Sequence, residues 1–157
     1  MLTKKSAVVQ AFPCVTIAST QAEKLVATLR RTAAVFRDVE RVDDTSLVRH
    51  IYDTWYIVNS GSVNMLQLTA FVERAINLDI QRYGNQYPQF CNSAVTELKT
   101  GLDELKNNPI HQQRYEQFVT PMVYGKQSVS WEKAYGCFRQ TALSILNALP
   151  AGQHRQT

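Results

Sequence analysis

Apolar residues recur with a helical period along the first part of the chain. Between Thr20 and about Glu40 they return every three or four positions, which predicts an amphipathic helix. Thr20 and Glu23 form a capping-box pattern, in which each side chain can bond the backbone N–H of the other residue, so we expect the helix to begin there. Asp44 is a good N-cap for a second helix, which ends at the turn of residues 59–62.

The segment Asn64–Tyr83 has a different pattern, because its apolar residues point in nearly every direction around a helix. A helix that is apolar on all sides is usually buried on most of them. We therefore expect residues 64–83 to form the central helix, around which the others pack.

The second half of the chain predicts three more helices. Pro88 opens the first of them, and Gly101 lies beside its apolar face. Because glycine is unfavourable inside a helix, we expect either a close helix crossing or a local break at this position. A short helix over residues 110–119 and a last helix over about 130–148 follow, each ended by a proline.

These patterns predict an all-α fold, a compact bundle of about six helices around the central helix. An extended arm of residues 1–19 precedes a single helical domain of residues 20–149, and residues 150–157 form a mobile polar tail. The chain has no internal repeat and no linker long enough to divide it, so we expect one domain.

Composition adds a mild basic charge and a shortage of charged residues. The formal net charge is +4, and charged residues make up 19% of the chain against a usual value of ~25%. Such a surface repels its neighbours weakly, which favours self-association or a protein partner.

The cysteines and the apolar segments indicate in which cellular compartment the protein is expected. Three scattered cysteines without a CxxC pattern indicate reduced thiols, so we expect a cytoplasmic protein. Lys4 and Lys5 precede an apolar stretch that loosely imitates a signal peptide, but Gln10 and Pro13 interrupt it, which disfavours secretion. No apolar run reaches the length of a bilayer span, so a membrane is not an expected partner.

None of the common catalytic patterns appears in the sequence. The histidines have no second ligand at metal-binding spacing, and the glycines form neither a phosphate loop nor a dinucleotide fingerprint. A nucleophile motif is missing as well. The sequence therefore predicts a protein with no metal, no cofactor and no catalytic residues, which is not an enzyme.

A group of arginines provides candidate phosphate contacts. Its members are Arg30, Arg31, Arg37 and Arg41. Arg30, Arg37 and Arg41 share one strip of the first predicted helix, and Arg31 lies beside it. Such a row of arginines can bind phosphates. Glu23 and Asp38 lie on or near the same strip, so surface ion pairs are the competing interpretation.

Large aromatic side chains provide candidate contacts to a protein partner, because interfaces favour Tyr and Trp. The candidates are Tyr56, Tyr115, Tyr124 and Trp131. Packing inside the bundle is the competing interpretation, and the sequence does not decide between the two.

These observations lead to three hypotheses of function. The first is a non-enzymatic helical interaction protein that binds a protein partner, or copies of itself, through the aromatic side chains. The alternative is a nucleic-acid-associated protein, including a coat or nucleoprotein-like role, that uses the arginines. The third is an enzyme of unrecognised type, and a pocket lined by His50 or His111 with a nearby carboxylate would favour it.

Overall fold

A computed structural model of the chain describes residues 15–40, 42–123 and 128–150. Within these ranges the chain is helical and contains no strand, so the predicted all-α compact bundle is confirmed. The α-helices are α1 (Ile17–Phe36), α2 (Arg49–Asn59), α3 (Met65–Tyr83), α4 (Pro88–Asn92), α5 (Ala94–Asn107), α6 (Ile110–Phe118) and α7 (Trp131–Ala148). Two short 3-10 helices, η1 (Thr45–Val48) and η2 (Thr120–Met122), precede α2 and follow α6.

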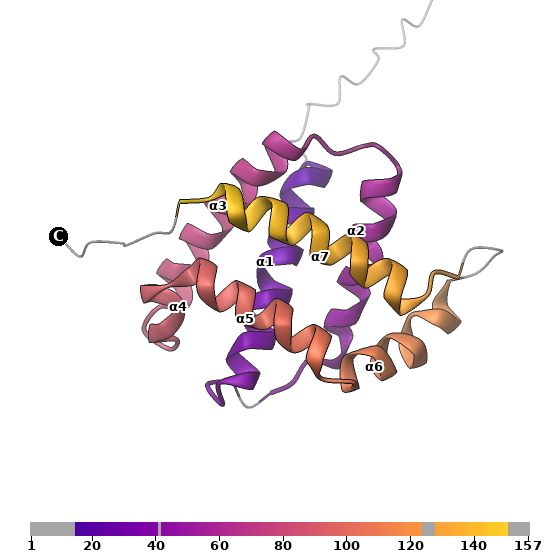
Figure 1. Cartoon of the computed structure of the whole chain (residues 1–157). Coiled ribbons are helices and arrows are strands. Elements are labelled where there is room, and N and C mark those ends of the chain that lie inside the picture. The colour runs from indigo at the N-terminus through magenta and orange to yellow at the C-terminus, as the bar shows by residue number, and fades with distance from the viewer. Residues whose placement is uncertain (1–14, 41, 124–127, 151–157) are drawn as a thin grey trace, which may run out of the picture.

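The helix at the centre of the bundle is α1. Figure 1 shows it behind α5 and α7, with α3 on one side and α2 on the other. It buries 11 of its 20 residues, whereas α3 buries four of its 19. The prediction that residues 64–83 form the central helix is therefore wrong. Leu66 of α3, for example, is 84% exposed, because it lies in the first turn at the edge of the bundle.

The first helix begins earlier than the capping-box pattern predicts. Thr16 is the N-cap, and its side-chain oxygen accepts a hydrogen bond from the backbone N–H of Ser19 at 3.1 Å. Residues 17–19 are therefore helical and do not belong to an extended arm. The rest of the predicted arm, apart from residues 15 and 16, lies outside the described residues, as do residues 151–157 of the predicted tail.

The first helix also ends earlier than predicted, at Phe36 rather than near Glu40. Asp38 has a φ of 57°, in the left-handed region, so the backbone leaves the helical path there. The backbone N–H groups of Val39 and Glu40 then donate to the carbonyl of Ala34, which turns the chain back along α1.

A close crossing joins α1 and α5. A Cβ on Gly101 would lie 2.1 Å from the backbone oxygen of Leu29, so a larger side chain does not fit between the two helices. This crossing explains the glycine, and it was one of the two alternatives that the sequence left open. The break occurs at Ser93 instead, which separates α4 from α5.

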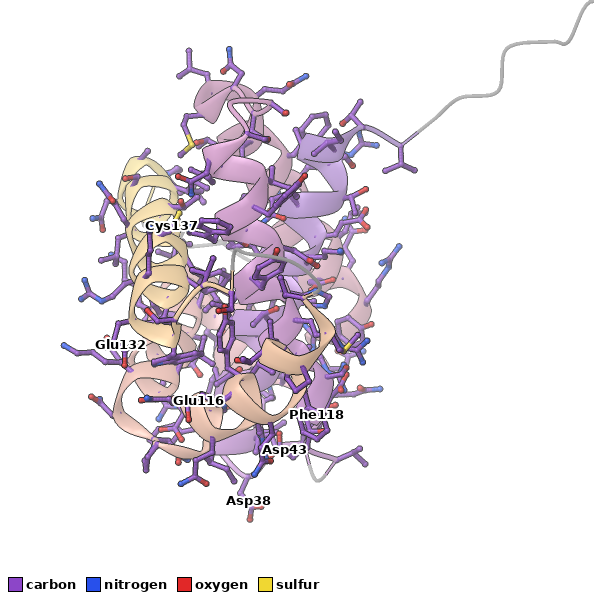
Figure 2. All side chains as sticks on the ribbon, turned by 90° about the vertical axis from the view of Figure 1, so that its right-hand side faces the viewer. Asp38, Asp43, Glu116, Phe118, Glu132 and Cys137 are labelled. Atoms are coloured by element: carbon purple, nitrogen blue, oxygen red, sulfur yellow. The ribbon has the colours of Figure 1, made fainter. Side chains whose placement is uncertain are left out.

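Other predicted boundaries agree with the structure. Asp44 caps η1, which leads directly into α2, and its side chain accepts from the N–H of Ser46 at 2.9 Å. Asn64 caps α3 in the same way. At the end of the bundle where Figure 2 labels Asp43, Arg114 of α6 forms an ion pair with that carboxylate. In these ranges no helix combines the length and apolarity that a bilayer span requires.

Candidate functional site

Polar side chains from α1 and α2 meet where these two helices pack together. Gln21 and Lys24 lie about one turn apart on α1, and His50, Asp53 and Thr54 lie about one turn apart on α2. We call these five residues the α1–α2 polar cluster. The helical spacing brings each set to one face, and the packing of α2 on α1 brings the two faces together.

The charged members of the cluster form a short chain of contacts. The Nζ atom of Lys24 donates to Oδ2 of Asp53 at 2.9 Å, and both side chains are about one third exposed (35% and 34%). The Nδ1 atom of His50 lies 3.5 Å from the same oxygen, so a protonated imidazole adds a second positive charge. Burial alone raises the pKa of Asp53, but the nearby donors of His50 and Lys24 outweigh burial and hold this pKa below its ordinary value.

Two buried polar atoms of the cluster form no hydrogen bond of ordinary length with a described residue. Nε2 of Gln21 donates to Oγ1 of Thr54, which donates to the backbone oxygen of His50 at 2.8 Å. Oε1 of Gln21 and Nδ1 of His50 are buried and form no hydrogen bond with another described residue. A buried polar atom without a partner is costly, so such atoms are uncommon and call for an explanation, such as a bound water, an ion or a catalytic role. Neither Gln21 nor His50 lines the cavity beside the cluster, and Nδ1 of His50 already lies against Oδ2 of Asp53.

A shallow cavity of about 400 Å³ opens beside the cluster. Its walls are Lys24, Tyr52, Asp53, Tyr56 and Ile57. The volume lies within the ~300–1,000 Å³ that small-molecule sites occupy. The rings of Tyr52 and Tyr56 are stacked with centroids 6.4 Å apart, and Tyr56 is 61% exposed. An ammonium group, a carboxylate and an exposed aromatic face are thus available to one ligand.

The predicted arginine strip is divided in the structure. Arg30 pairs with Asp79, Arg31 with Asp44 and Glu40, and Arg37 with Glu97. Arg37 lies beyond the last residue of α1, so it does not continue the strip along the helix. Arg41 lies outside the described residues. Every described arginine of the group therefore has a carboxylate partner, and its contact with phosphate stays a prediction.

Two of the predicted partner contacts are buried in the core. Tyr115 and Trp131 are 1% and 7% exposed, and their rings pack edge to face at 5.6 Å. The Tyr115 hydroxyl donates to the backbone oxygen of Val129, and burial raises its pKa to about 12. These two side chains cannot form a surface contact, which corrects their assignment. Tyr56 is exposed and stays a prediction, and Tyr124 lies outside the described residues.

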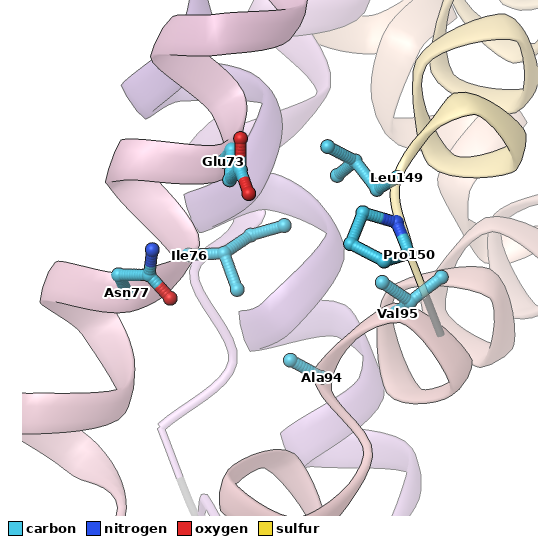
Figure 3. A pocket seen from close by; sticks show the side chains of 7 residues that line it. All are labelled: Glu73, Ile76, Asn77, Ala94, Val95, Leu149 and Pro150. Atoms are coloured by element: carbon cyan, nitrogen blue, oxygen red, sulfur yellow. The ribbon is translucent and has the colours of Figure 1, made fainter. Parts of the chain in front are cut away.

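A separate cavity lies where α3 faces the start of α5 and the end of α7. Figure 3 shows Glu73, Ile76 and Asn77 of α3 opposite Leu149 and Pro150. Its volume is about 130 Å³, and its lining contains no cation and no ring other than that of proline. This cavity is too small and too apolar for a charged substrate.

A model of the family described as nucleotidyl transferase AbiEii toxin, Type IV TA system, matches residues 5–137. The chain belongs to this family. No curated protein and no solved structure matches the chain. The family is defined by an enzymatic activity and by membership of a toxin–antitoxin system, so an antitoxin is the partner that its description implies.

Membership of the AbiEii family corrects two predictions made from the sequence. The chain was expected to be a non-enzymatic interaction protein, and no enzymatic activity was expected, whereas a nucleotidyl transferase is an enzyme. The same finding replaces the alternative of a coat or nucleoprotein-like role. The family supports the hypothesis that was ranked third, an enzyme. The structural sign expected of it was a pocket lined by His50 or His111, whereas the cavity beside the cluster is lined by Asp53 but not by His50.

Nucleotidyl transfer commonly uses divalent metal ions held by carboxylates. In the ranges 15–40, 42–123 and 128–150, no group of three or more His, Cys, Asp or Glu side chains is close enough together to hold a metal ion. Asp53 and His50 are two such side chains, but a third is missing. The described residues therefore do not fit a complete metal centre.

Lys24 and Asp53 are not among the site residues predicted from the sequence. The available signal is weak: polar residues recur at helical spacing in both α1 and α2. Such spacing shows that Gln21 and Lys24 share a face, but it does not show which other helix that face meets. Only the packing of α2 on α1 brings the two sets together.

Proposed function

We propose that the chain acts in nucleotidyl transfer as the toxin of a toxin–antitoxin pair, with the α1–α2 polar cluster at the reacting phosphate. In this reaction a hydroxyl oxygen of the acceptor forms a bond to the α-phosphorus of a nucleoside triphosphate. The bond from that phosphorus to the bridging oxygen breaks, pyrophosphate leaves with the electron pair, and the hydroxyl proton passes to a base or to water. The observation that carries the proposal is the Lys24–Asp53 pair beside a cavity lined by Tyr52 and the exposed Tyr56.

Lys24 has the capacity for this role. An ammonium group has three N–H donors, and one of them is used by Asp53. The other two can donate to oxygens of the reacting phosphate, where negative charge increases in the transition state. The partial burial of Lys24 strengthens that interaction, because water screens the two charges less.

Asp53 orients the acceptor. Its pKa is held below the ordinary value, so it is ionised at neutral pH and accepts a hydrogen bond from a hydroxyl group. Oδ2 contacts Lys24 and His50, which leaves Oδ1 for that hydroxyl. A carboxylate of low pKa is a weak base, so its main contribution is to position the nucleophile. The exposed face of Tyr56 offers a surface on which a base can stack.

The proposed function implies where the protein acts and which molecules it meets there. A toxin of this kind acts where nucleoside triphosphates are made and used, which is the cytoplasm. Its antitoxin is the protein partner, and the acceptor is a molecule with an accessible hydroxyl group.

The test is label transfer from nucleotides. The purified chain is incubated with Mg²⁺, total cell extract as acceptor, and each nucleoside triphosphate labelled at either the α- or the γ-phosphate. We expect the α-label to appear on an acceptor and the γ-label to appear in pyrophosphate, which separates nucleotidyl transfer from phosphoryl transfer. Lys24→Met keeps the apolar stem and removes the charge, and it should lower the initial rate by about 100-fold.

Lys106→Met is the matched control, because Lys106 is exposed on α5 and forms no ion pair with a described residue. This variant should transfer label at the wild-type rate. Absence of transfer from the α-label by the wild-type chain would contradict the proposed reaction. Equal rates for Lys24→Met and Lys106→Met would contradict the proposed site.

A further inference from the structure

A second pair of cavities lies on α1, on the side that faces α3. The larger has a volume of about 440 Å³, and its walls include Ala27, Arg30, Arg31, Glu40 and Tyr83. Its neighbour, of about 200 Å³, reaches along α3 to Asp79 and Arg82. Ala27, Arg30 and Tyr83 line both cavities, so Arg30 stands on the boundary between them. We call the two cavities together the Arg30 cleft.

Arg30 is held firmly but uses few of its hydrogen-bond donors. It is 8% exposed, its Nε donates to Oδ2 of Asp79 at 2.9 Å, and its Cζ lies 4.0 Å from the centroid of the Tyr83 ring. Guanidinium groups have five N–H donors, and Arg30 forms no other hydrogen bond with a described residue. Its two terminal nitrogens, with four N–H groups, are therefore left for a ligand that enters the cleft.

Asp79 and Tyr83 lie one turn apart on α3, so a single rigid helix fixes both the edge and the face of the guanidinium. A planar group held in this way is preorganised for two parallel hydrogen bonds to one oxyanion. Arg30 therefore needs little additional ordering when a ligand binds, and this saving favours affinity.

The charges that line the cleft come from three arginines and three carboxylates. Two arginines and one carboxylate, Glu40, line the larger cavity, while Asp79 contacts Arg30 from the smaller cavity. Arg82 lies at the smaller cavity and forms no ion pair with another described residue. Glu23 also lines the smaller cavity, and Arg31 pairs with Glu40 and Asp44, so Arg82 is the one arginine of the cleft without an acidic partner among the described residues.

The Arg30 cleft and the cavity beside the α1–α2 polar cluster share no lining residue, but α1 contributes residues to both. Lys24, Ala27 and Arg31 follow one another at helical spacing on one side of this helix. Lys24 and Arg31 are seven residues apart, or about 10 Å along the helix axis. Ala27 lies between them and has no side chain beyond Cβ, so the space above it is open to both cavities of the cleft.

We propose that the Arg30 cleft is a second phosphate-binding site, which holds a further phosphate group while the α1–α2 polar cluster holds the reacting one. The phosphate belongs either to the polyphosphate tail of a nucleotide or to the phosphodiester backbone of an acceptor strand, and its recognition by the guanidinium is the same in both cases. The location of the reacting phosphate rests on the proposed function. Phosphate binding by the cleft does not, and it is measured without catalysis.

The experiment measures binding by titration calorimetry with three probes: inorganic pyrophosphate, ATP and a short RNA oligonucleotide. Arg30→Gln combined with Asp79→Asn removes both charges of the pair, so neither is left buried alone. We expect this variant to lose about 10- to 100-fold in affinity for the probes that the wild-type chain binds. Ala27→Phe is the second variant, since it fills the floor of the cleft without changing any charge, and it should weaken binding in the same way.

Arg74→Gln is the matched control, because Arg74 is exposed on α3 and pairs with no described residue. It should bind like the wild-type chain, and thermal unfolding checks that each variant folds. Loss of pyrophosphate and ATP binding in the cleft variants assigns the site to the nucleotide tail, and loss of oligonucleotide binding alone assigns it to the acceptor strand. The proposal is overturned if the wild-type chain binds none of the probes, or if both cleft variants bind as tightly as Arg74→Gln.

Lys24→Met separates this proposal from the proposed function. It should retain pyrophosphate binding in the Arg30 cleft even where label transfer is lost. Binding that disappears in Lys24→Met and persists in the cleft variants overturns the second site and leaves the catalytic proposal intact. If the wild-type chain transfers no label but binds a probe that the cleft variants do not bind, the proposed function is contradicted. The phosphate-binding site in the Arg30 cleft is then supported.

Discussion

The two sides of α1 differ in how they are packed. On the side of α5, the backbones approach so closely at Leu29 that only glycine fits at position 101. On the sides of α2 and α3, charged residues form pairs and cavities lie between the helices, as at Lys24 and Arg30. One helix thus provides a rigid apolar contact on one side and the candidate binding surfaces on the others. We infer that the tight contact with α5 holds α1 in place while ligands bind on its polar sides.

Substitution at the tight crossing should have the largest effect on stability. In Gly101→Ala the new Cβ meets the backbone oxygen of Leu29, which cannot move without shifting α1 or α5. We expect a loss of about 3 kcal/mol in the free energy of unfolding, measured by urea denaturation. Gly136→Ala on α7 is the control, because its Cβ meets nothing within 4 Å. The control should stabilise the protein by up to ~1 kcal/mol through helix propensity. Equal effects of the two alanines would show that α5 does not hold α1 as described.

Removing a buried hydroxyl on the α2 side should have a smaller effect. Thr54→Val deletes the acceptor of Gln21 Nε2 and leaves that amide buried without a partner. We expect a loss of about 2 kcal/mol in the free energy of unfolding, the cost of a buried unsatisfied donor. Thr32→Val is the control, because Thr32 is also buried but its hydroxyl forms no hydrogen bond with a described residue. A Thr54→Val variant as stable as the control would mean that the α1–α2 contact does not depend on this hydrogen bond.

The smallest effect concerns the dependence of stability on pH. The pKa of Asp53 is lower in the folded chain than its ordinary value of 3.8, so folding favours the ionised form. This stabilisation is present above the unfolded pKa and is lost as pH falls through the folded one. In Asp53→Asn, denaturation between pH 6 and pH 3 should show a flatter loss of stability than the wild-type chain. The difference should not exceed ~1 kcal/mol, because the pair is partly exposed.

The control for this measurement is Asp103→Asn, since Asp103 is exposed on α5 and forms no ion pair with a described residue. Its pH dependence should follow that of the wild-type chain. If both variants flatten the profile equally, the contact of Asp53 with Lys24 and His50 adds nothing to stability.

The helical class of the fold could be predicted from the sequence, because apolar periodicity and caps are local signals. Asp44 caps η1 as the pattern indicates, and α3 (Met65–Tyr83) occupies the segment predicted as a helix over residues 64–83. These local signals could not predict which helix is the most buried. Helix α1 contains Gln21 and Arg30, which look like surface residues but are buried because α2 and α3 supply their polar partners. Leu66 of α3 looks like a core residue but has no neighbouring helix to cover it.

The candidate site was predicted less well than the fold. Arg30 was recognised as a cation that can meet phosphate, but its partner Asp79 is 49 residues away and was not foreseen. Lys24 and Asp53 are common surface residue types, and only their approach to within 2.9 Å beside a cavity makes them candidates. Tyr115 and Trp131 were considered for a surface role because aromatic residues occur both in cores and at interfaces. In each case the missing information was which helices meet.

The contacts of α1 and of Arg37, the residue that follows it, also differ in how many residues separate the two partners in sequence. This separation affects the order in which the helices associate during folding. The hydrogen bonds from α1 to α2 join residues 29 and 33 positions apart, whereas the pair of Arg37 with Glu97 of α5 joins residues 60 positions apart. Shorter loops close at a lower entropic cost, and an N-terminal segment leaves the ribosome first. We expect α1 and α2 to associate before α5 is available. The charged cluster would then take shape in a nascent chain that still lacks the helix that later holds α1 in place.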